Sequence, residues 1–307
     1  MPSVAVSGRA RLELPHPAGG GRKFVWRDGA FGLDDESVPV LAYDVSPSGW
    51  TDELTALHED EGGSDHFIEI ASRRHALTEV MRCLGDHQAG TVLEVGCSSG
   101  FLLRELRDAL PKAMVIGADY TRGTLEALAK KLPGVPLVQF DLAQCPLPDD
   151  FADVTVLLNV LEHIGDDGAA VRHLFRITRP GGAVVIEVPA GASLFDIYDR
   201  VLMHQRRYDM AGLVALVEDA NFTVERKSHL GALLFPAFYV SKRLHQWRYP
   251  AGGKVDEKEI VATNIRATRR SGRVMAPIMR LEASLRRHAY LPFGIRCLLT
   301  CRKPDRS

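Results

Sequence analysis

Short apolar runs alternate with amphipathic stretches between residues 91 and 189. The runs have the length and composition of buried strands, and the stretches between them carry apolar residues at helical spacing. The pattern predicts strands over 91–96, 114–119, 135–141, 153–161 and 182–189, with helices over 101–110, 124–132 and 168–178. Strands that alternate with helices form βαβ units, so we expect a doubly wound α/β fold with a parallel sheet and helices on both faces.

The pattern is less regular at the N-terminus. Pro and Gly interrupt short apolar fragments, which predicts an irregular segment over 1–60. Within it, 24–31 has the pattern of two short strands around an Asp-Gly turn, and 36–43 has the pattern of one edge strand. Helical spacing over 65–84 follows, and Gly85 ends the helix.

The main domain, which we expect over 61–307, continues beyond the last predicted strand. Residues 190–250 form an insertion, and Leu230–Val240 within it is apolar and aromatic. We expect this apolar run to be a helix packed on the sheet; a pocket wall and a patch at a membrane surface are the alternatives. The basic stretch Ile265–His288 predicts a solvated amphipathic helix.

Composition excludes several classes of protein. The 307 residues include 38 Lys and Arg against 39 Asp and Glu, and 46% are apolar. This balance excludes intrinsic disorder and a chain-wide basic surface for nucleic acid. No run reaches the roughly 18 apolar residues of a transmembrane segment, and no signal-peptide core is present. The five cysteines form no CxxC pair, so we expect a cytoplasmic protein with free thiols, no structural zinc and no absolute requirement for a divalent ion.

A turn with two glycines follows the first predicted strand. Glu94 lies near the end of this strand, and Gly96-Cys97-Ser98-Ser99-Gly100 leads into the next helix. Gly96 permits a tight turn, Gly100 lets the helix approach the strand, and the backbone N–H groups between them face the sheet edge. A packing turn would also explain this motif, so its meaning depends on the other strand ends.

Polar side chains end the next three strands as well. Asp119 lies 25 residues after Glu94, where an acid can accept both hydroxyls of a ribose. Asp141 ends the third strand, where it can accept a hydrogen bond from an adenine amine, and Asn159 follows the fourth. Because the carboxyl ends of parallel strands share one edge, these residues predict a nucleoside site there.

Two other kinds of nucleotide site fit the sequence less well. A Rossmann dehydrogenase requires GxGxxG, and Ser98 stands where the second glycine would be, so a pyrophosphate would be crowded. A P-loop requires GK[ST], and none follows Gly100. The turn therefore favours a nucleoside without a diphosphate, with an NAD(P)-dependent oxidoreductase as the alternative.

The combined motifs resemble those of the class I S-adenosylmethionine-dependent methyltransferases. The matching segments are VLEVGCSSG at 92–100, Asp119, FDL at 140–142, NVLEHI at 159–164 and RPGG at 179–182. The likeness is to the branch of ubiquinone-biosynthesis-type and related small-molecule methyltransferases, and it covers about 65–189. It implies a Rossmann-like methyltransferase fold, S-adenosylmethionine as cofactor and methyl transfer as the reaction.

The resemblance assigns cofactor contacts to individual residues. Asp119 would hold the ribose, and Asp141 with Leu142 would frame the adenine. The two glycines of the turn would flank the methionine part, with Asn159 beside it. The predicted cofactor site comprises Arg73, Glu94, Gly96, Cys97, Ser98, Gly100, Asp119, Tyr120, Asp141, Leu142 and Asn159.

One bacterial subgroup of these enzymes is similar in further segments. The helix that carries Arg73 resembles its N-terminal cap over the cofactor. His204-Gln205-Arg206-Arg207-Tyr208 is similar to a His-x-Arg-Arg-Tyr segment after its fifth strand. Some relatives begin with a four-cysteine zinc ribbon. This chain has no cysteine before Cys83, so a ribbon-like module over 1–60 would be metal-free.

Three residues are candidates for catalysis: His163, His204 and Tyr208. Methyl transfer to a hydroxyl requires an aligned acceptor and removal of a proton, and histidine is the natural base near neutral pH. The Glu-His pair that contains His163 is structural in many relatives. Beside His204, Arg206 and Arg207 could bind an anionic acceptor; the alternative is a helix end with Tyr208 packed in the interior.

We therefore expect an enzyme that methylates a small molecule, on oxygen rather than on nitrogen or carbon. The acceptor would be hydrophobic or anionic, because apolar residues and arginines both lie in the insertion. Nucleic acid is excluded as acceptor, since the Asn/Asp-Pro-Pro-aromatic tetrad of DNA-methylating relatives is absent at Asn159. A non-catalytic nucleoside-binding protein is the remaining alternative. No feature of the sequence indicates an oligomeric state.

Overall fold

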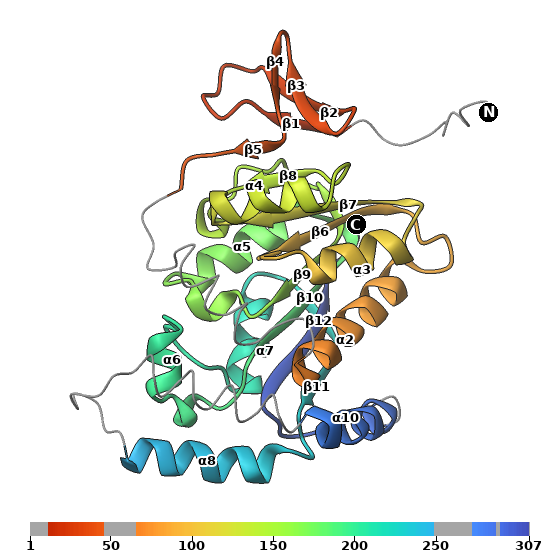
Figure 1. Ribbon diagram of the computed structural model, residues 1–307. Helices are drawn as coiled ribbons and strands as arrows, with labels where there is room; N and C mark the ends of the chain where they lie inside the picture. Colours follow the sequence, from red (N-terminus) through yellow and green to blue (C-terminus); the bar gives the residue numbers. More distant parts are fainter. Residues whose placement is uncertain (1–11, 46–65, 249–271, 287–288, 307) are drawn as a thin grey trace.

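The computed structural model describes residues 12–45, 66–248, 272–286 and 289–306 (Figure 1). Two sheets are present in this part of the chain. One has four strands in the order β1-β2-β3-β4, and the other has eight in the order β11-β12-β10-β9-β6-β7-β8-β5. None of the helices in the described ranges is long and apolar enough to cross a membrane.

The small sheet lies within the segment that the sequence predicted to be irregular. Its antiparallel strands are β1 (Glu13–Pro15), β2 (Lys23–Arg27), β3 (Ala30–Leu33) and β4 (Glu36–Val38). The predicted Asp-Gly hairpin is confirmed, because Asp28 and Gly29 both have positive φ between β2 and β3. The part of 1–60 that the structure describes is therefore largely ordered as strands.

The predicted single edge strand over 36–43 is wrong, because the structure divides it in two. β4 ends at Val38, and β5 (Val40–Ala42) pairs in parallel with β8 at the edge of the large sheet. Pro39 separates them, and proline cannot donate a backbone hydrogen bond to a ladder. The chain thus passes from the small sheet to the large sheet at this proline.

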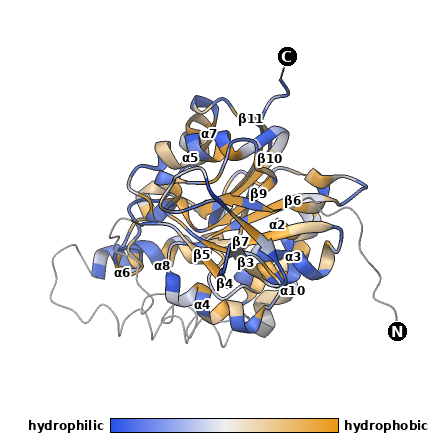
Figure 2. Ribbon diagram, turned by 90° about the horizontal axis from the view of Figure 1, so that it is seen from above, coloured by the Kyte–Doolittle hydropathy of each residue, from blue (hydrophilic) through white to orange (hydrophobic). Residues whose placement is uncertain are grey.

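The five predicted parallel strands are confirmed in the large sheet. They are β6 (Gly90–Val95), β7 (Ala113–Asp119), β8 (Leu137–Gln139), β9 (Ala152–Leu158) and β10 (Thr178–Pro189). Two antiparallel strands, β11 (Thr223–Leu230) and β12 (Arg296–Arg302), extend the sheet beyond β10. Apolar residues concentrate on the central strands, as Figure 2 shows.

Helices cover both faces of this sheet, which confirms the doubly wound α/β prediction. On one face, α2 (Phe67–Leu84), α3 (Phe101–Ala109) and α4 (Arg122–Lys131) contribute buried leucines and valines to one core cluster. On the other face, α5 (Asp167–Ile177) and α7 (Met210–Asp219) contribute to a second cluster. The parallel strands are hence buried on both sides, as their continuous apolar runs require.

The segment after β10 differs from its prediction in two respects: Leu230 of the predicted helical run ends a strand, so that the helix begins only at Phe235, and this helix is not packed on the sheet as expected. The segment forms α6 (Ile197–Val201), α7, β11 and α8 (Phe235–Arg248). α8 is not packed on the sheet through its apolar residues: Val240, Leu244 and Trp247 are 56%, 55% and 80% exposed. The helical period places these three on one outer face, while the aliphatic part of Lys242 is buried on the inner one.

The predicted basic helix is present as α10 (Gly272–Arg286), which contains Pro277. Residues 265–271 and 287–288 of the predicted range lie outside the described residues. In Figure 1, α10 lies beside α2 and β11. The C-terminal helix therefore covers the edge of the sheet where the antiparallel strands are.

Candidate active site

A cavity of about 580 Å³ lies at the carboxyl end of the parallel strands. Residues at or just after the ends of all five predicted strands line it, as expected for an open α/β sheet. Ten of the eleven predicted cofactor residues are among its walls: Arg73, Glu94, Gly96, Cys97, Ser98, Asp119, Tyr120, Asp141, Leu142 and Asn159. His163 and His204 line it too.

The turn after β6 requires glycine at two positions. Gly96 has φ +77°, and a Cβ there would lie 2.4 Å from Cγ2 of Val160. Gly100 has φ +76°, and a Cβ would lie 2.5 Å from Cδ1 of Leu128. Gly100 is thus a packing position at the start of α3, next to the cavity lining rather than in it. The tight-turn role of Gly96 agrees with this geometry, whereas the close approach at Gly100 is to Leu128 of α4 and not to the strand.

Asp119 is fixed at the end of β7 by its neighbours. Its Oδ2 accepts a hydrogen bond from the backbone N–H of Ser98 at 2.9 Å, and its Oδ1 accepts from the N–H and the hydroxyl of Thr121 at 2.9 and 2.7 Å. A carboxylate can accept about four hydrogen bonds, so this one keeps capacity for a ligand hydroxyl. The contacts make Asp119 a preoriented acceptor in the cavity wall.

Asp141 is held in a similar way after β8. Its Oδ1 accepts from the N–H of Ala143 at 2.8 Å and so caps the short helix η1 (Leu142–Gln144). Asn159 has a left-handed backbone (φ +54°), and its N–H donates to the carbonyl of Glu187 at 2.9 Å. The side chain of Asp141 and the backbone of Asn159 are therefore held in place beside the cavity.

Glu94 and Arg73 stand on the side of the cavity toward α2 and α3. Burial, together with the charges of Asp119 and Glu105, raises the pKa of Glu94 well above its usual value, and its Oε2 has no hydrogen-bond partner among the described residues. Arg73 donates to Glu105 at 2.9 Å and lies over the ring of Phe101. An unsatisfied buried carboxyl oxygen in a cavity wall is a polar atom available to a ligand.

The buried thiol of Cys97 does not suit a nucleophile. Burial and the charges of Asp119 and Glu94 raise its pKa well above the usual range, so the thiolate is disfavoured. Its side chain lies 3.2 Å from the position of a Cβ at Gly117. Cys97 therefore serves as a small packing residue in the turn.

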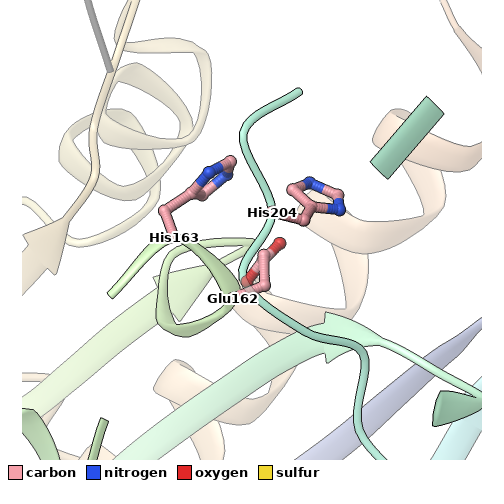
Figure 3. Close-up of side chains that lie close together, drawn as sticks. All are labelled: Glu162, His163 and His204. Atoms are coloured by element: carbon pink, nitrogen blue, oxygen red, sulfur yellow. The ribbon is translucent and has the colours of Figure 1, made fainter. Parts of the chain in front are cut away.

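Two histidines and a glutamate of the cavity wall lie close together (Figure 3). Glu162 and His163 come from the short helix η2 (Leu161–His163), and His204 follows α6. The ring centroids of His163 and His204 are 4.8 Å apart at an angle of 72°. Figure 3 shows the Glu162 carboxylate lying near both rings.

Glu162 is fully buried, and neither carboxylate oxygen has a hydrogen-bond partner in the described part of the chain. Burial raises its pKa to about 8, so the carboxyl group is largely protonated at neutral pH. A neutral carboxylic acid keeps one donor and spare acceptor capacity. Glu162 can consequently donate to or accept from a polar group in the cavity.

A buried carboxylate orients His204. The Nδ1 of His204 lies 2.8 Å from Oδ1 of Asp199, which Arg207 also contacts through Nε at 2.7 Å. Lys242 of α8 lies 3.3 Å from the other oxygen. Burial alone would raise the pKa of Asp199, but the His204 hydrogen bond and the two cations hold it well below its usual range. Asp199 is hence an anion that accepts a hydrogen bond from the Nδ1–H of His204.

His204 is therefore neutral at neutral pH. Its burial lowers its pKa, and the hydrogen bond and charge of Asp199 offset only part of this effect. Because Nδ1 donates to Asp199, Nε2 is left as the acceptor of the ring. This is the arrangement of a general base.

Tyr208 does not line the cavity. Its hydroxyl lies 2.8 Å from Oδ2 of Asp167 and 3.2 Å from the carbonyl of Leu161, and burial with these partners raises its pKa. The position agrees with an interior packing role. Arg206 and Arg207 are engaged by Asp167 and Asp199, so both guanidinium groups already have carboxylate partners within the fold.

Sequence reasoning missed four residues that the fold brings to the cavity or to its histidines. Asp199 and Glu162 were absent from the predicted site, although both stand within five residues of a predicted histidine. Phe238 and Arg296 line the cavity from α8 and β12. Arg296 donates to Ser72 at 2.7 Å and to Glu187 at 2.6 Å. No local signal marks Phe238 or Arg296, because their contribution depends on tertiary placement.

The fold groups three side chains that could act as metal ligands, while the absence of structural zinc and of a required divalent ion stays a prediction. Glu162, His163 and His204 each offer one ligand atom, and these atoms all lie within 4.8 Å of one another. The sequence hides this grouping because His204 stands about 40 residues after His163. Among the described residues, this set could hold a divalent ion.

Known proteins are similar to this chain in sequence. Residues 93–186 match the family described as a methyltransferase domain. Over 156 residues the chain is 35% identical to a probable S-adenosylmethionine-dependent methyltransferase of Mycolicibacterium smegmatis, a match that covers 50% of this chain and 59% of that protein. Over 141 residues it is 29% identical to a malonyl-[acyl-carrier protein] O-methyltransferase of Serratia marcescens, covering 43% and 54%. The chain thus spans little more than half the length of these curated relatives.

A solved structure shares the fold. Phosphoethanolamine N-methyltransferase 2 of Haemonchus contortus, in complex with S-adenosyl-L-methionine, superposes with a TM-score of 0.55 at 14% identity. The superposition covers 83% of this chain and 58% of that one. The Rossmann-like architecture is accordingly the one that methyltransferases of this kind use.

Proposed function

We propose that this chain, whose residues 93–186 form a methyltransferase domain of the class I S-adenosylmethionine-dependent type, methylates a hydroxyl group of a small molecule. One observation carries the proposal. A single cavity has preoriented carboxylates, Asp119 and Asp141, at the strand ends, and an Asp199-oriented histidine elsewhere in its wall.

The residues present fit the cofactor. Gly96 in the cavity wall leaves room for the Val160 side chain, and Glu94 offers a buried unsatisfied oxygen in the same wall. Asp119 would accept from the ribose hydroxyls, and Asp141 with Leu142 would frame the adenine. When bound, S-adenosylmethionine supplies an electrophilic methyl carbon on a sulfonium, so the protein's task is to align the acceptor and remove a proton.

His204 is the proposed base. Nε2 of His204 would accept the hydroxyl proton of the acceptor, and S-adenosylmethionine, when bound, would supply the methyl group that replaces this proton. Asp199 holds the ring in the required tautomer and stabilises the imidazolium that results. His163, beside it, lines the same wall. A base in this position supports O-methylation, because a hydroxyl must lose its proton during transfer whereas a neutral amine can lose it afterwards.

Two variants test the two halves of the site separately. Asp119→Ala removes the ribose acceptor and should weaken S-adenosylmethionine binding by about 1–3 kcal/mol, as measured by calorimetry. His204→Ala should retain cofactor affinity and lose roughly 10²–10⁴-fold in turnover, measured as S-adenosylhomocysteine formed with a panel of hydroxyl acceptors.

Four results would contradict parts of this proposal. Unchanged cofactor affinity in Asp119→Ala would remove the ribose assignment, and parental turnover in His204→Ala would remove the base. Binding of NAD or NADP in place of S-adenosylmethionine would favour an oxidoreductase. Cofactor binding without turnover on any acceptor class would favour a nucleoside-binding protein.

A chelator tests whether Glu162, His163 and His204 hold a metal. We expect methyl transfer with His204 as the base to need no divalent ion. Dialysis against a chelator should therefore leave turnover unchanged. Loss of turnover that a divalent ion restores would instead assign these three residues as its ligands.

A further inference from the structure

A second cavity, of about 970 Å³, lies between α2, α10, β11 and β12. In Figure 1, α10 runs beside α2 at the end of the molecule where β11 forms the sheet edge. The two cavities share α2 but not its residues, because Glu69 and Arg73 line the first whereas Ile70 and Arg74 line the second. The second cavity is consequently a separate space from the proposed active site.

One part of this cavity is apolar. Phe67 and Ile70 of α2, Met279 of α10 and Leu298 of β12 line it. Phe67, Met279 and Leu298 are buried and pack in one cluster. This wall can contact an aliphatic or aromatic group without a polar partner.

The rest of the lining is strongly basic. Six Arg and Lys residues face two carboxylates, Glu79 and Glu225. These acids pair with Arg82 at 3.0 Å each, and Glu79 lies 3.6 Å from Arg226. The other four cations have no ion-pair partner within the described ranges: Arg74, Lys227, Arg280 and Arg286.

Arg286 is the most informative of these cations. Its Nη1 is buried and has no hydrogen-bond acceptor among the described residues. A buried guanidinium N–H without an acceptor is costly, and an anion in the cavity would satisfy it. Burial, and then the charges of Arg286, Arg226 and Arg82, lower the pKa of His75 to about 3, which reflects the positive potential at this end.

The wall that carries Arg280 and Arg286 is anchored. Glu282, fully buried on the same helix, accepts from the backbone N–H of Gly231 at 2.7 Å and of Leu233 at 3.0 Å. These bonds tie α10 to the loop after β11. Ala276, Met279, Arg280, Ala283 and Arg286 follow one another at helical spacing toward the cavity. The cations are hence presented by a helix whose position is fixed.

We propose that this second cavity binds an amphipathic organic anion, in which one phosphate or carboxylate group contacts the arginines and an aliphatic chain lies on the apolar wall. Such an anion pairs cations that the fold leaves unpaired, and it covers apolar lining at the same time. The ligand is either a free acyl or alkyl anion or the anionic lipid of a membrane. This site is independent of the methyl-transfer site.

Calorimetry with decyl phosphate tests the proposal on the full chain. We expect saturable one-to-one binding that persists in the presence of saturating S-adenosylhomocysteine. Arg286→Gln should weaken it by about tenfold or more, and Arg280→Gln, an exposed position that is safe for folding, should weaken it several-fold. Arg243→Gln, on the outer side of α8, is the matched control and should leave it unchanged. Decanol and inorganic phosphate should each bind more weakly than decyl phosphate.

Three results would overturn the proposal. They are absence of saturable binding, displacement of decyl phosphate by S-adenosylhomocysteine, and equal binding by the Arg280→Gln and parental proteins. Sedimentation with phosphatidylglycerol vesicles separates the two sources of the ligand. Co-sedimentation that Arg280→Gln reduces points to a membrane lipid, and decyl phosphate binding without co-sedimentation points to a free anion.

Discussion

Glu162 is a buried side chain of the candidate site whose carboxyl group has an unusually high proton affinity. Its carboxyl group is fully buried, without a hydrogen-bond partner among the described residues, and its pKa is raised to about 8. The neighbouring His204 is affected in the opposite direction, because burial lowers the pKa of a cationic acid. At neutral pH Glu162 and His204 are therefore both largely uncharged.

The raised pKa of Glu162 makes stability depend on pH. The folded state holds this proton up to about pH 8, whereas the unfolded chain releases it near 4.5, so ionisation opposes folding between these values. The free energy of unfolding should thus lose this contribution as pH rises from about 4.5 to 8. Glu162→Gln cannot ionise, and at pH 8.5 it should be more stable than the parent by about 3–5 kcal/mol.

Urea denaturation at pH 5 and pH 8.5 measures this difference. Glu218→Gln, on the exposed side of α7, is the matched control and should follow the parent at both pH values. An identical pH dependence in Glu162→Gln and the parent would show that the Glu162 carboxyl is ionised in the folded protein.

At the scale of elements, α8 is joined to the site by charge rather than by apolar packing. Lys242, buried on its inner face, lies 2.6 Å from Asp196 and 3.3 Å from Asp199. Phe238, one turn earlier, lines the cavity. The ion pairs therefore position both a wall of the cavity and the carboxylate that orients His204.

Replacing this lysine should destabilise the fold. Lys242→Met leaves two buried carboxylates short of a cation, and removing one partner of a buried pair costs about 3–5 kcal/mol. Chemical denaturation should detect this loss, with Arg243→Met, at the next and exposed position, close to the parent. A cost below about 1 kcal/mol for Lys242→Met would mean that α8 is held by other contacts.

At the scale of the molecule, the sequence predicted the parallel part of the sheet well. Each of the five strands β6 to β10 follows from an apolar run, because it is buried on both faces, and such runs are recognisable locally; β5, which also pairs in parallel, was not predicted as part of this sheet. β11 escaped prediction because its first five residues, Thr223–Lys227, are mostly charged and exposed. The break at Pro39 was also missed, since a short strand on each side of a proline resembles one interrupted strand.

The candidate site was also predictable only in part. Asp119, Asp141 and Asn159 follow strands, so sheet topology alone brings them to one edge. The cluster around His204 depends on contacts between η2, the segment after α6 and α8, which no periodicity encodes. Asp199 and Lys242 therefore became visible only in the folded chain.

A crystal structure of the complex with S-adenosylhomocysteine tests the central claim most directly. We expect the ribose hydroxyls on Asp119, the adenine beside Asp141 and Leu142, and the sulfur directed toward His163 and His204 in the same cavity. The account would be contradicted by a ligand whose ribose is away from Asp119. It would be contradicted equally by a sulfur more than about 10 Å from both histidines, because a base must reach the proton within about one hydrogen bond or one bridging water.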